Sequence, residues 1–265
     1  MCVDISLHSD VKSIIKAFPG LKDKRTSHKP ADAEQLSAFV FPEFPIIYRQ
    51  QDSQILTEME WGVIPLYLHD AKERETRRRS MFNARSERIL DDKKSYWHKL
   101  RNNRCLIPVS GTYEHRKIKG WSKKVPYYIW MKDRDIQYIP GLYQADPSAD
   151  NGGESTKTFT MITRAGNEIM NKIHNDGENK HRMPLFLTPE LEEAWLLDDL
   201  KESEIHEIFN FEMPPESMGY HPVYTLRGVD ERPDHKHKYD PWNWPNLPEL
   251  GNDTPPRQQT SLFDN

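Results

Sequence analysis

Cysteine is scarce in this chain: its 265 residues include only Cys2 and Cys105. Two cysteines so far apart do not form the framework of a small disulfide-stabilised protein, and they suit a reducing compartment. Long apolar runs are also missing. Asp4, His8 and Asp10 interrupt the first segment, and no stretch approaches the ~20 apolar residues of a membrane span. We therefore expect a cytoplasmic protein without a membrane-spanning segment.

An excess of positive charge is absent as well. The net charge is −4 and the isoelectric point is about 6.3, so the whole molecule is not a general binder of polyanions. Any surface for nucleic acid must be a local basic cleft. The eleven histidines are scattered, and the pair His235 and His237 lacks a third ligand at a useful spacing. We expect neither a metal ion nor another cofactor.

The order of the expected elements favours an α+β fold. Short strands mix with short helices, such as those expected over 10–18, 167–174 and 188–198, without a regular βαβ alternation. Such a pattern indicates a mostly antiparallel core in one domain. The apolar runs Tyr127–Met131 and Ile136–Ile139 flank a charged turn and predict a β-hairpin.

The composition changes after residue 228. The segment 229–265 contains six prolines, and its last residues read as a flexible tail. We therefore divide the chain into a domain over 1–228 and a proline-rich extension over 229–265.

Cys2 carries chemistry that its position makes possible. A methionine before a small residue is normally trimmed, which leaves an N-terminal cysteine with an amine and a thiol on adjacent carbons. These groups titrate at roughly 7.7–8.0 and 8.5 when unperturbed. An aldehyde can form an imine with the amine, and the thiol can then close a thiazolidine ring in a favourable intramolecular step. Taken alone, a cysteine at position 2 is more often accidental.

Several motifs elsewhere in the chain, taken together, make a chance occurrence of Cys2 implausible. In chain order they are Met1-Cys2, Trp61-Gly-Val-Ile-Pro65, Asn83-Ala-Arg-Ser-Glu87, a segment from Cys105 to Gly111-Thr-Tyr-Glu114, Thr163-Arg-Ala165, Ile173-His-Asn175 and Arg182-Met-Pro184. In this order they resemble the SOS response-associated peptidase (SRAP) family, from Met1 to about Arg227. The resemblance implies a single α+β domain with a barrel-like antiparallel β core, flanking short helices and a basic cleft leading to the N-terminus. It also implies that the chain shields abasic sites in single-stranded DNA by a covalent link.

The resemblance implies one set of catalytic residues and one set of DNA-binding residues. The catalytic residues are Cys2, Asn83, Glu114 and His174. The DNA-binding residues are Arg85 and Arg182, which match arginines that contact phosphates, and the aromatic residues Trp61 and Tyr67.

Each catalytic residue type suits the expected chemistry. Glu114 can shuttle protons during imine formation, and His174 can protonate the ring oxygen of the sugar so that its aldehyde appears. Asn83 can hold the amine or the product ring without adding charge. Singly, these residues also fit surface charge, a helix C-terminal cap and a turn. Cys105 is expected to be a small apolar residue of a core strand.

The sequence departs from the family pattern at several positions. Asp4 stands where the family has an arginine, which removes a phosphate contact, and His115 replaces a tryptophan. Residues 176–181 form an insertion between His174 and the Arg-Met-Pro motif. The insertion makes His181 a rival for the catalytic histidine. We prefer His174, because Ile173 precedes it as in the family.

The extreme C-terminus contains a second motif. Gln259-Thr-Ser-Leu-Phe263 resembles the pentapeptide that docks bacterial repair proteins on the sliding clamp. Leu262 and Phe263 would enter an apolar pocket, and Gln259 would bind at its rim. A chance match is the alternative reading.

The leading functional hypothesis is a monomeric enzyme that links itself through Cys2 to abasic sites in single-stranded DNA. One alternative is a thiol peptidase that uses Cys2 for removal of its own first residue. Another is a non-covalent single-stranded-DNA-binding module recruited by the sliding clamp.

Overall fold

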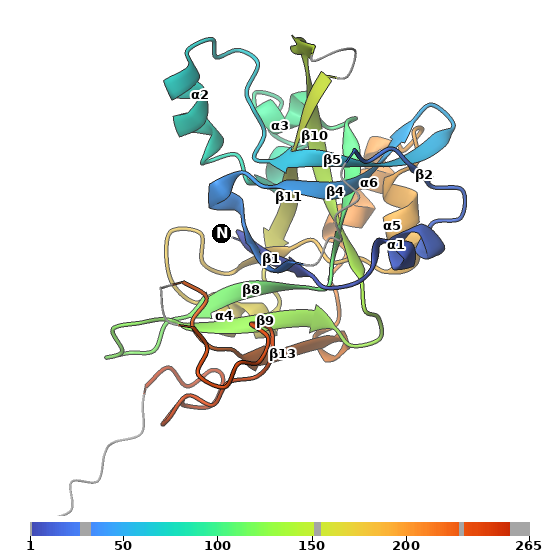
Figure 1. Cartoon of the computed structure of the whole chain (residues 1–265). Helices are drawn as coiled ribbons and strands as arrows, with labels where there is room; N and C mark the ends of the chain where they lie inside the picture. The colour runs from blue at the N-terminus through green and yellow to red at the C-terminus, as the bar shows by residue number, and fades with distance from the viewer. Residues whose placement is uncertain (1, 27–32, 151–154, 228–230, 255–265) are drawn as a thin grey trace, which may run out of the picture.

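Two β-sheets make up most of the molecule (Figure 1). The computed structural model describes residues 2–26, 33–150, 155–227 and 231–254. The first sheet consists, in order, of β13 (Met218–Pro222), β9 (Val125–Met131), β8 (Gly111–Arg116), β1 (Asp4–Leu7) and β3 (Ala33–Ser37). All its pairings are antiparallel. The predicted α+β class with a mostly antiparallel core is confirmed.

The second sheet curls into a ring. Its order is β12 (Arg182–Pro184), β11 (Ser155–Ala165), β10 (Gln137–Asp150), β7 (Arg104–Val109), β4 (Glu43–Gln50), β5 (Ser53–Trp61) and β2 (Lys22–Asp23). A short strand, β6 (Asn83–Arg85), pairs with β11. Strand β11 also pairs with β5, at Thr158 opposite Glu60 and Phe159 opposite Trp61, which joins five strands into a ring. Because only two residue pairs make this last junction, the core is barrel-like rather than fully closed.

Short helices flank the sheets. They are α1 (Val11–Ala17), α2 (Ala71–Arg78), α3 (Tyr96–Lys99), α4 (Glu168–Ile173), α5 (Pro189–Trp195) and α6 (Glu202–Asn210). The side chains of Asp10 and Asn167 accept hydrogen bonds from the backbone of the first turns of α1 and α4, two helices that the sequence predicted. None of the described helices is long and apolar enough to cross a membrane.

The predicted hairpin of β9 and β10 is wrong. Strand β9 pairs with β8 and β13, whereas β10 pairs with β7 and β11 in the other sheet. The turn between them crosses from one sheet to the other. Arg134 in this turn forms an ion pair with the buried Glu192 of α5 at 2.8 Å, which holds the crossing against that helix. A charged turn between two apolar runs therefore marks a change of sheet here.

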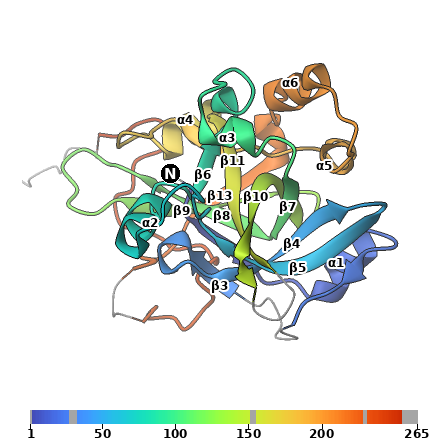
Figure 2. The ribbon, with the colours of Figure 1, turned by 90° about the horizontal axis from the view of Figure 1, so that it is seen from above.

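Strand β1 brings the N-terminus to the place where the two sheets meet (Figures 1 and 2). It lies between β8 and β3, with Asp4 opposite Tyr113 of β8. The backbone oxygen of Val3 accepts a hydrogen bond from the backbone N–H of Ala38 at 2.8 Å. Gly111 in β8 allows the close approach of Tyr128, because a Cβ atom there would lie 2.3 Å from that ring.

The extension after residue 230 lies along the first sheet as a strap, which we define as residues 231–254 (Figure 1). The fully buried guanidinium of Arg116 holds its end. It donates hydrogen bonds to the backbone oxygens of Pro248, Glu249 and Asn252 and forms an ion pair with Asp253 at 2.8 Å. The same Asp253 accepts a hydrogen bond from Asn175, the residue after His174. The strap therefore supports the loop that follows α4.

Arg116→Ala should lower the free energy of unfolding by about 3 kcal/mol, because it leaves several strap acceptors without a buried donor. Urea denaturation measures the change, and limited proteolysis should detect release of residues 248–254. Arg88→Ala is the matched control, since Arg88 forms an exposed ion pair with Asp92, and should cost no more than about 0.5 kcal/mol. An unchanged urea midpoint for Arg116→Ala would contradict this role.

Candidate active site

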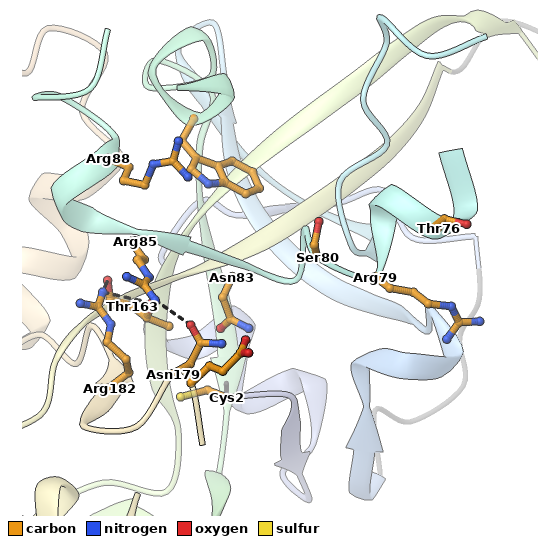
Figure 3. Close-up of a pocket in the computed structure, with 12 residues that line it drawn as sticks. Cys2, Thr76, Arg79, Ser80, Asn83, Arg85, Arg88, Thr163, Asn179 and Arg182 are labelled. Atoms are coloured by element: carbon orange, nitrogen blue, oxygen red, sulfur yellow. Dashed lines mark hydrogen bonds between the residues drawn. The ribbon is translucent and has the colours of Figure 1, made fainter. Parts of the chain in front are cut away.

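Cys2 lies at the wall of a cavity of about 470 Å³ (Figure 3). The residue is 0% exposed as a whole. Asn83 and Arg85 of β6 and Arg182 of β12 line the same cavity, and Figure 3 shows the side chain of Asn83 close to Cys2. The structure thus brings together residues that are far apart in the sequence.

The Cys2 thiol is neutral in this environment. Burial raises its pKa well above the ordinary value, and the nearby negative charge of Glu114 raises it further. Glu114 is itself buried, in β8, next to the residue that pairs with Asp4. The Glu114 side chain therefore lies near the Cys2 thiol. A thiol of this kind needs a neighbouring group to take its proton when it reacts.

His174 lies on the other side of Glu114. It caps the end of α4, where its backbone N–H donates to the oxygen of Met170. Its Nδ1 is 2.9 Å from the backbone oxygen of Arg182, and its Nε2 is 3.9 Å from Oε2 of Glu114. Because a carbonyl oxygen only accepts, Nδ1 carries a proton and Nε2 faces the carboxylate. Proton exchange between the imidazole and Glu114 is therefore possible.

His181, the rival for the catalytic histidine, lies outside both cavities near Cys2. His181 is exposed and has a left-handed backbone, with φ of 60°. Its backbone bonds to His174 and Gly166, so that it closes the base of the inserted loop. Its side chain lines neither of the two cavities near Cys2 in the described chain. The structure thus brings His174, not His181, to Glu114.

Unpaired polar atoms are concentrated around Cys2. Among the described residues, eight buried side-chain nitrogen and oxygen atoms have no hydrogen-bond partner, and four of them belong to Asn83, Glu114 and Arg182. Both polar atoms of the Asn83 amide are in this set. Buried polar groups are normally paired, so such a concentration indicates a site that is completed by a ligand.

Arginines line one side of this first cavity. Arg182 is held by Glu87, through bonds of 2.5 and 3.0 Å, and by the backbone oxygen of Thr163. Arg85 donates to the side chain of Asn179 at 2.7 Å (Figure 3). Partial burial acts to raise the pKa of Glu87, but the Arg182 guanidinium outweighs it and lowers that pKa. The pairing fixes the Arg182 guanidinium at the cavity wall.

Sequence reasoning did not assign all the arginines of the first cavity to a site. Two further arginines line the cavity, Arg79 beside α2 and Arg88 after β6. Both lie in charged segments that resemble an ordinary solvated surface. Their place in the cavity follows only from the fold.

The insertion divides the region into two cavities. Glu178 and Asn179 line the first cavity and also a second one, of about 510 Å³. The second cavity contains Glu114 and His174, whereas the first contains Cys2. Lys124 pairs with Asp176 of the insertion at 2.9 Å and holds the loop on this side. The loop therefore lies between the arginines of the first cavity and the Glu114–His174 pair of the second.

Trp61 does not fit the predicted role in DNA binding. It is 0% exposed, stacks on Phe159 and donates its indole N–H to the backbone oxygen of Phe82. A base cannot reach it, and its role is to support the strand that carries Asn83. Tyr67 is 52% exposed and packs edge-on against Tyr96. It lies outside the residues that line the two cavities, so its contact with DNA stays a prediction.

The remaining predictions concern cysteine, metals and the tail. Cys105 is buried in β7, as expected, and burial raises its pKa. Within the described chain, no cluster of three or more histidine, cysteine or acidic residues could hold a metal ion. Gln259, Leu262 and Phe263 lie outside the described residues.

The arrangement combines a buried N-terminal thiol, an acid–base pair and arginines in a mixed α/β fold. The model of the SOS response-associated peptidase (SRAP) family matches residues 1–228, and the chain belongs to this family. The predicted resemblance is confirmed.

Several known proteins are similar to the chain. The abasic site processing protein YoqW of Bacillus subtilis is 34% identical over 74% of this chain and 80% of its own length. The abasic site processing protein HMCES of Gallus gallus is 28% identical over 67% of this chain and 56% of its own length. A crystal structure of a protein from Bacteroides thetaiotaomicron superposes with a TM-score of 0.73 and 29% identity, and covers 91% of this chain and 97% of that one.

Asn83→Ala should leave the free energy of unfolding unchanged or raise it by about 1 kcal/mol, because the buried amide has no partner to lose. Asn167→Ala is the matched control. Asn167 caps α4 and bonds to the backbone of Met170 and Met213, so its loss should cost about 1–2 kcal/mol. Urea denaturation of both variants makes the comparison. Equal destabilisation would mean that Asn83 holds the fold rather than a ligand.

Proposed function

We propose that this chain captures abasic sites in single-stranded DNA as a covalent thiazolidine adduct of Cys2, as part of the response to DNA damage. The observation that carries the proposal is the place of Cys2 and the unpartnered Asn83 amide at one arginine-lined cavity, with Glu114 close enough to the thiol to raise its pKa. The names of the similar proteins YoqW and HMCES, both abasic site processing proteins, support a role at abasic sites.

The reaction starts once Met1 has been removed. The free amine of Cys2 attacks the aldehyde carbon of the open abasic sugar, and the carbinolamine loses water to give an imine. The thiol sulfur then adds to the imine carbon, and its proton passes to the nitrogen. One C–N bond and one C–S bond are formed, and no oxidant or reductant is required. Ring closure is fast because both nucleophiles belong to one residue.

Glu114 and His174 move the protons that these steps require. The neutral thiol gives its proton to the nearby Glu114 carboxylate. The imidazole of His174, with Nε2 3.9 Å from Glu114, supplies a proton to the ring oxygen when the sugar opens. The burial of both side chains strengthens their mutual influence, because little water screens them.

Asn83 and the arginines orient the sugar and its phosphates. The Asn83 amide offers a donor and an acceptor for the lesion, without a charge that would stabilise one protonation state. Arg85 and Arg182 bind the phosphates on one side of the lesion, where their planar groups can form paired hydrogen bonds. Binding of DNA exchanges the contact between Arg85 and Asn179 for a phosphate contact.

Incubation with an abasic single-stranded oligonucleotide should give a shifted band on a denaturing gel. Cys2→Ala should abolish the band, since the thiol is lost, and Cys105→Ser should leave it unchanged. Cys2→Ser keeps the amine, so it should give a stable band only when borohydride reduces the imine. His174→Ala should slow adduct formation at least tenfold, within the range of general acid catalysis.

The other functions predict different results in the same assay. A thiol peptidase would cleave a peptide substrate and leave no DNA adduct. A non-covalent binding module would show only association that weakens with salt. An adduct of equal yield from Cys2→Ala, or from a chain that retains Met1, would refute the thiazolidine.

The tail motif carries a second proposal, docking on the bacterial sliding clamp. A peptide of residues 255–265 should bind a purified clamp, because Leu262 and Phe263 are adjacent apolar anchors on a polar segment. Replacement of both by alanine should weaken binding at least tenfold in a fluorescence anisotropy titration. Equal binding by the alanine peptide would show that the match is accidental.

A further inference from the structure

We propose that Arg227 binds a backbone phosphate of the DNA strand next to the lesion, on the opposite side of the inserted loop from Arg85 and Arg182. The inference rests on the proposed function, since it names a further residue that binds the same strand. It starts from Asp4, which stands where the SRAP pattern has an arginine.

Asp4 does not repel DNA in this fold, because it is buried and paired. Only 1% of the residue is exposed. Its carboxylate accepts a hydrogen bond from Nε2 of Gln35 at 3.0 Å and one from Nη2 of Arg227 at 2.8 Å. A buried carboxylate with a guanidinium partner presents little negative charge to the surface. Asp4 therefore binds the guanidinium of Arg227, a residue from a distant part of the chain.

Arg227 is held in place but keeps donors for a ligand. Its side chain is 56% exposed, whereas that of Asp4 is 2% exposed. Its central carbon lies 5.5 Å from the ring centroid of Phe39, which supports the guanidinium from one side. A guanidinium has five N–H donors, and within the described chain only the bond from Nη2 to Asp4 uses one. The remaining donors suit a phosphate.

The position of Arg227 corresponds to one flank of the lesion. It lines the second cavity together with Glu114 and His174. Burial lowers the pKa of His115, the residue after Glu114, and the positive charges of Arg227 and Lys124 act in the same direction. A sugar bound at Cys2 and Glu114 has a phosphate on each side along the strand. The arginines of the first cavity meet one of them, and Arg227 meets the other.

Arg182 shows the same construction on its own side. Glu87, with a side chain that is 53% exposed, holds its guanidinium by an ion pair, as the buried Asp4 holds that of Arg227. Such a carboxylate fixes the direction of the planar group, so that less freedom is lost when a phosphate binds. The two pairs bracket the inserted loop.

The test measures binding apart from the covalent step. It uses a labelled single-stranded oligonucleotide whose tetrahydrofuran lesion cannot open to an aldehyde. Fluorescence anisotropy follows binding between about 50 and 200 mM KCl for the wild type, Arg227→Gln, Arg227→Lys and Arg49→Gln. For a single strand, each phosphate contact contributes about 0.7 to the slope of log K against log salt.

Arg227→Gln should bind about tenfold more weakly at low salt, and its slope should fall by about 0.7. Arg227→Lys should restore the slope while affinity recovers only in part, because an ammonium lacks the planar fork. Arg49→Gln is the control for loss of one charge, since Arg49 pairs with Asp198 away from both cavities; it should bind as the wild type does. A thermal melt of each variant separates loss of binding from loss of the fold.

Wild-type affinity and an unchanged slope for Arg227→Gln would overturn the role of Arg227 and leave the covalent function intact. A weaker but equally salt-sensitive variant would also overturn it, since the residue would then act only through the fold. A wild type that binds the analogue but never crosslinks a true abasic site would instead refute the covalent reaction. A wild type that does not bind the strand would overturn both proposals.

Discussion

The pairing of β1 with β8 is the constraint on which the site depends. Backbone hydrogen bonds fix the register, with Asp4 opposite Tyr113, so Glu114 takes its place near Cys2 through the ladder rather than through flexible side chains. Gly111 permits this arrangement, because a larger residue would collide with Tyr128 behind the strand. A chain terminus is ordinarily a poorly ordered place for a nucleophile. Here the terminus leads directly into β1, which is paired on both sides.

Burial determines the protonation of the site and also lowers the stability of the fold there. It keeps the Cys2 thiol neutral and leaves the amide of Asn83 without a partner, which lowers stability. Stability is recovered elsewhere, for example where Arg116 binds the strap. Asp253 of the strap also accepts a hydrogen bond from Asn175, the residue next to His174. The extension is therefore joined to the catalytic loop, although the family model ends at residue 228.

The sequence predicted the site best where local motifs carry it. Asn83, Glu114 and His174 were assigned from short segments; the fold places Asn83 in the cavity of Cys2, and Glu114 and His174 in the adjoining cavity. The DNA-binding role assigned to Trp61 was wrong, because an aromatic motif gives no sign of whether its ring faces a ligand or the core. The hairpin of β9 and β10 failed for a related reason. A turn between two apolar runs looks the same whether the strands pair or enter different sheets.

The sequence by itself determined the chemistry: a cysteine behind the first methionine, the order of the motifs, the class of fold and the family. Only the tertiary structure decided how these parts meet. It brought His174 rather than His181 to Glu114, buried Trp61, paired Asp4 with Arg227 and set the inserted loop between two cavities. The physical reason is that each of these outcomes depends on contacts between residues far apart in the chain. Periodicity and motif spacing give information only on residues that are close together in the sequence.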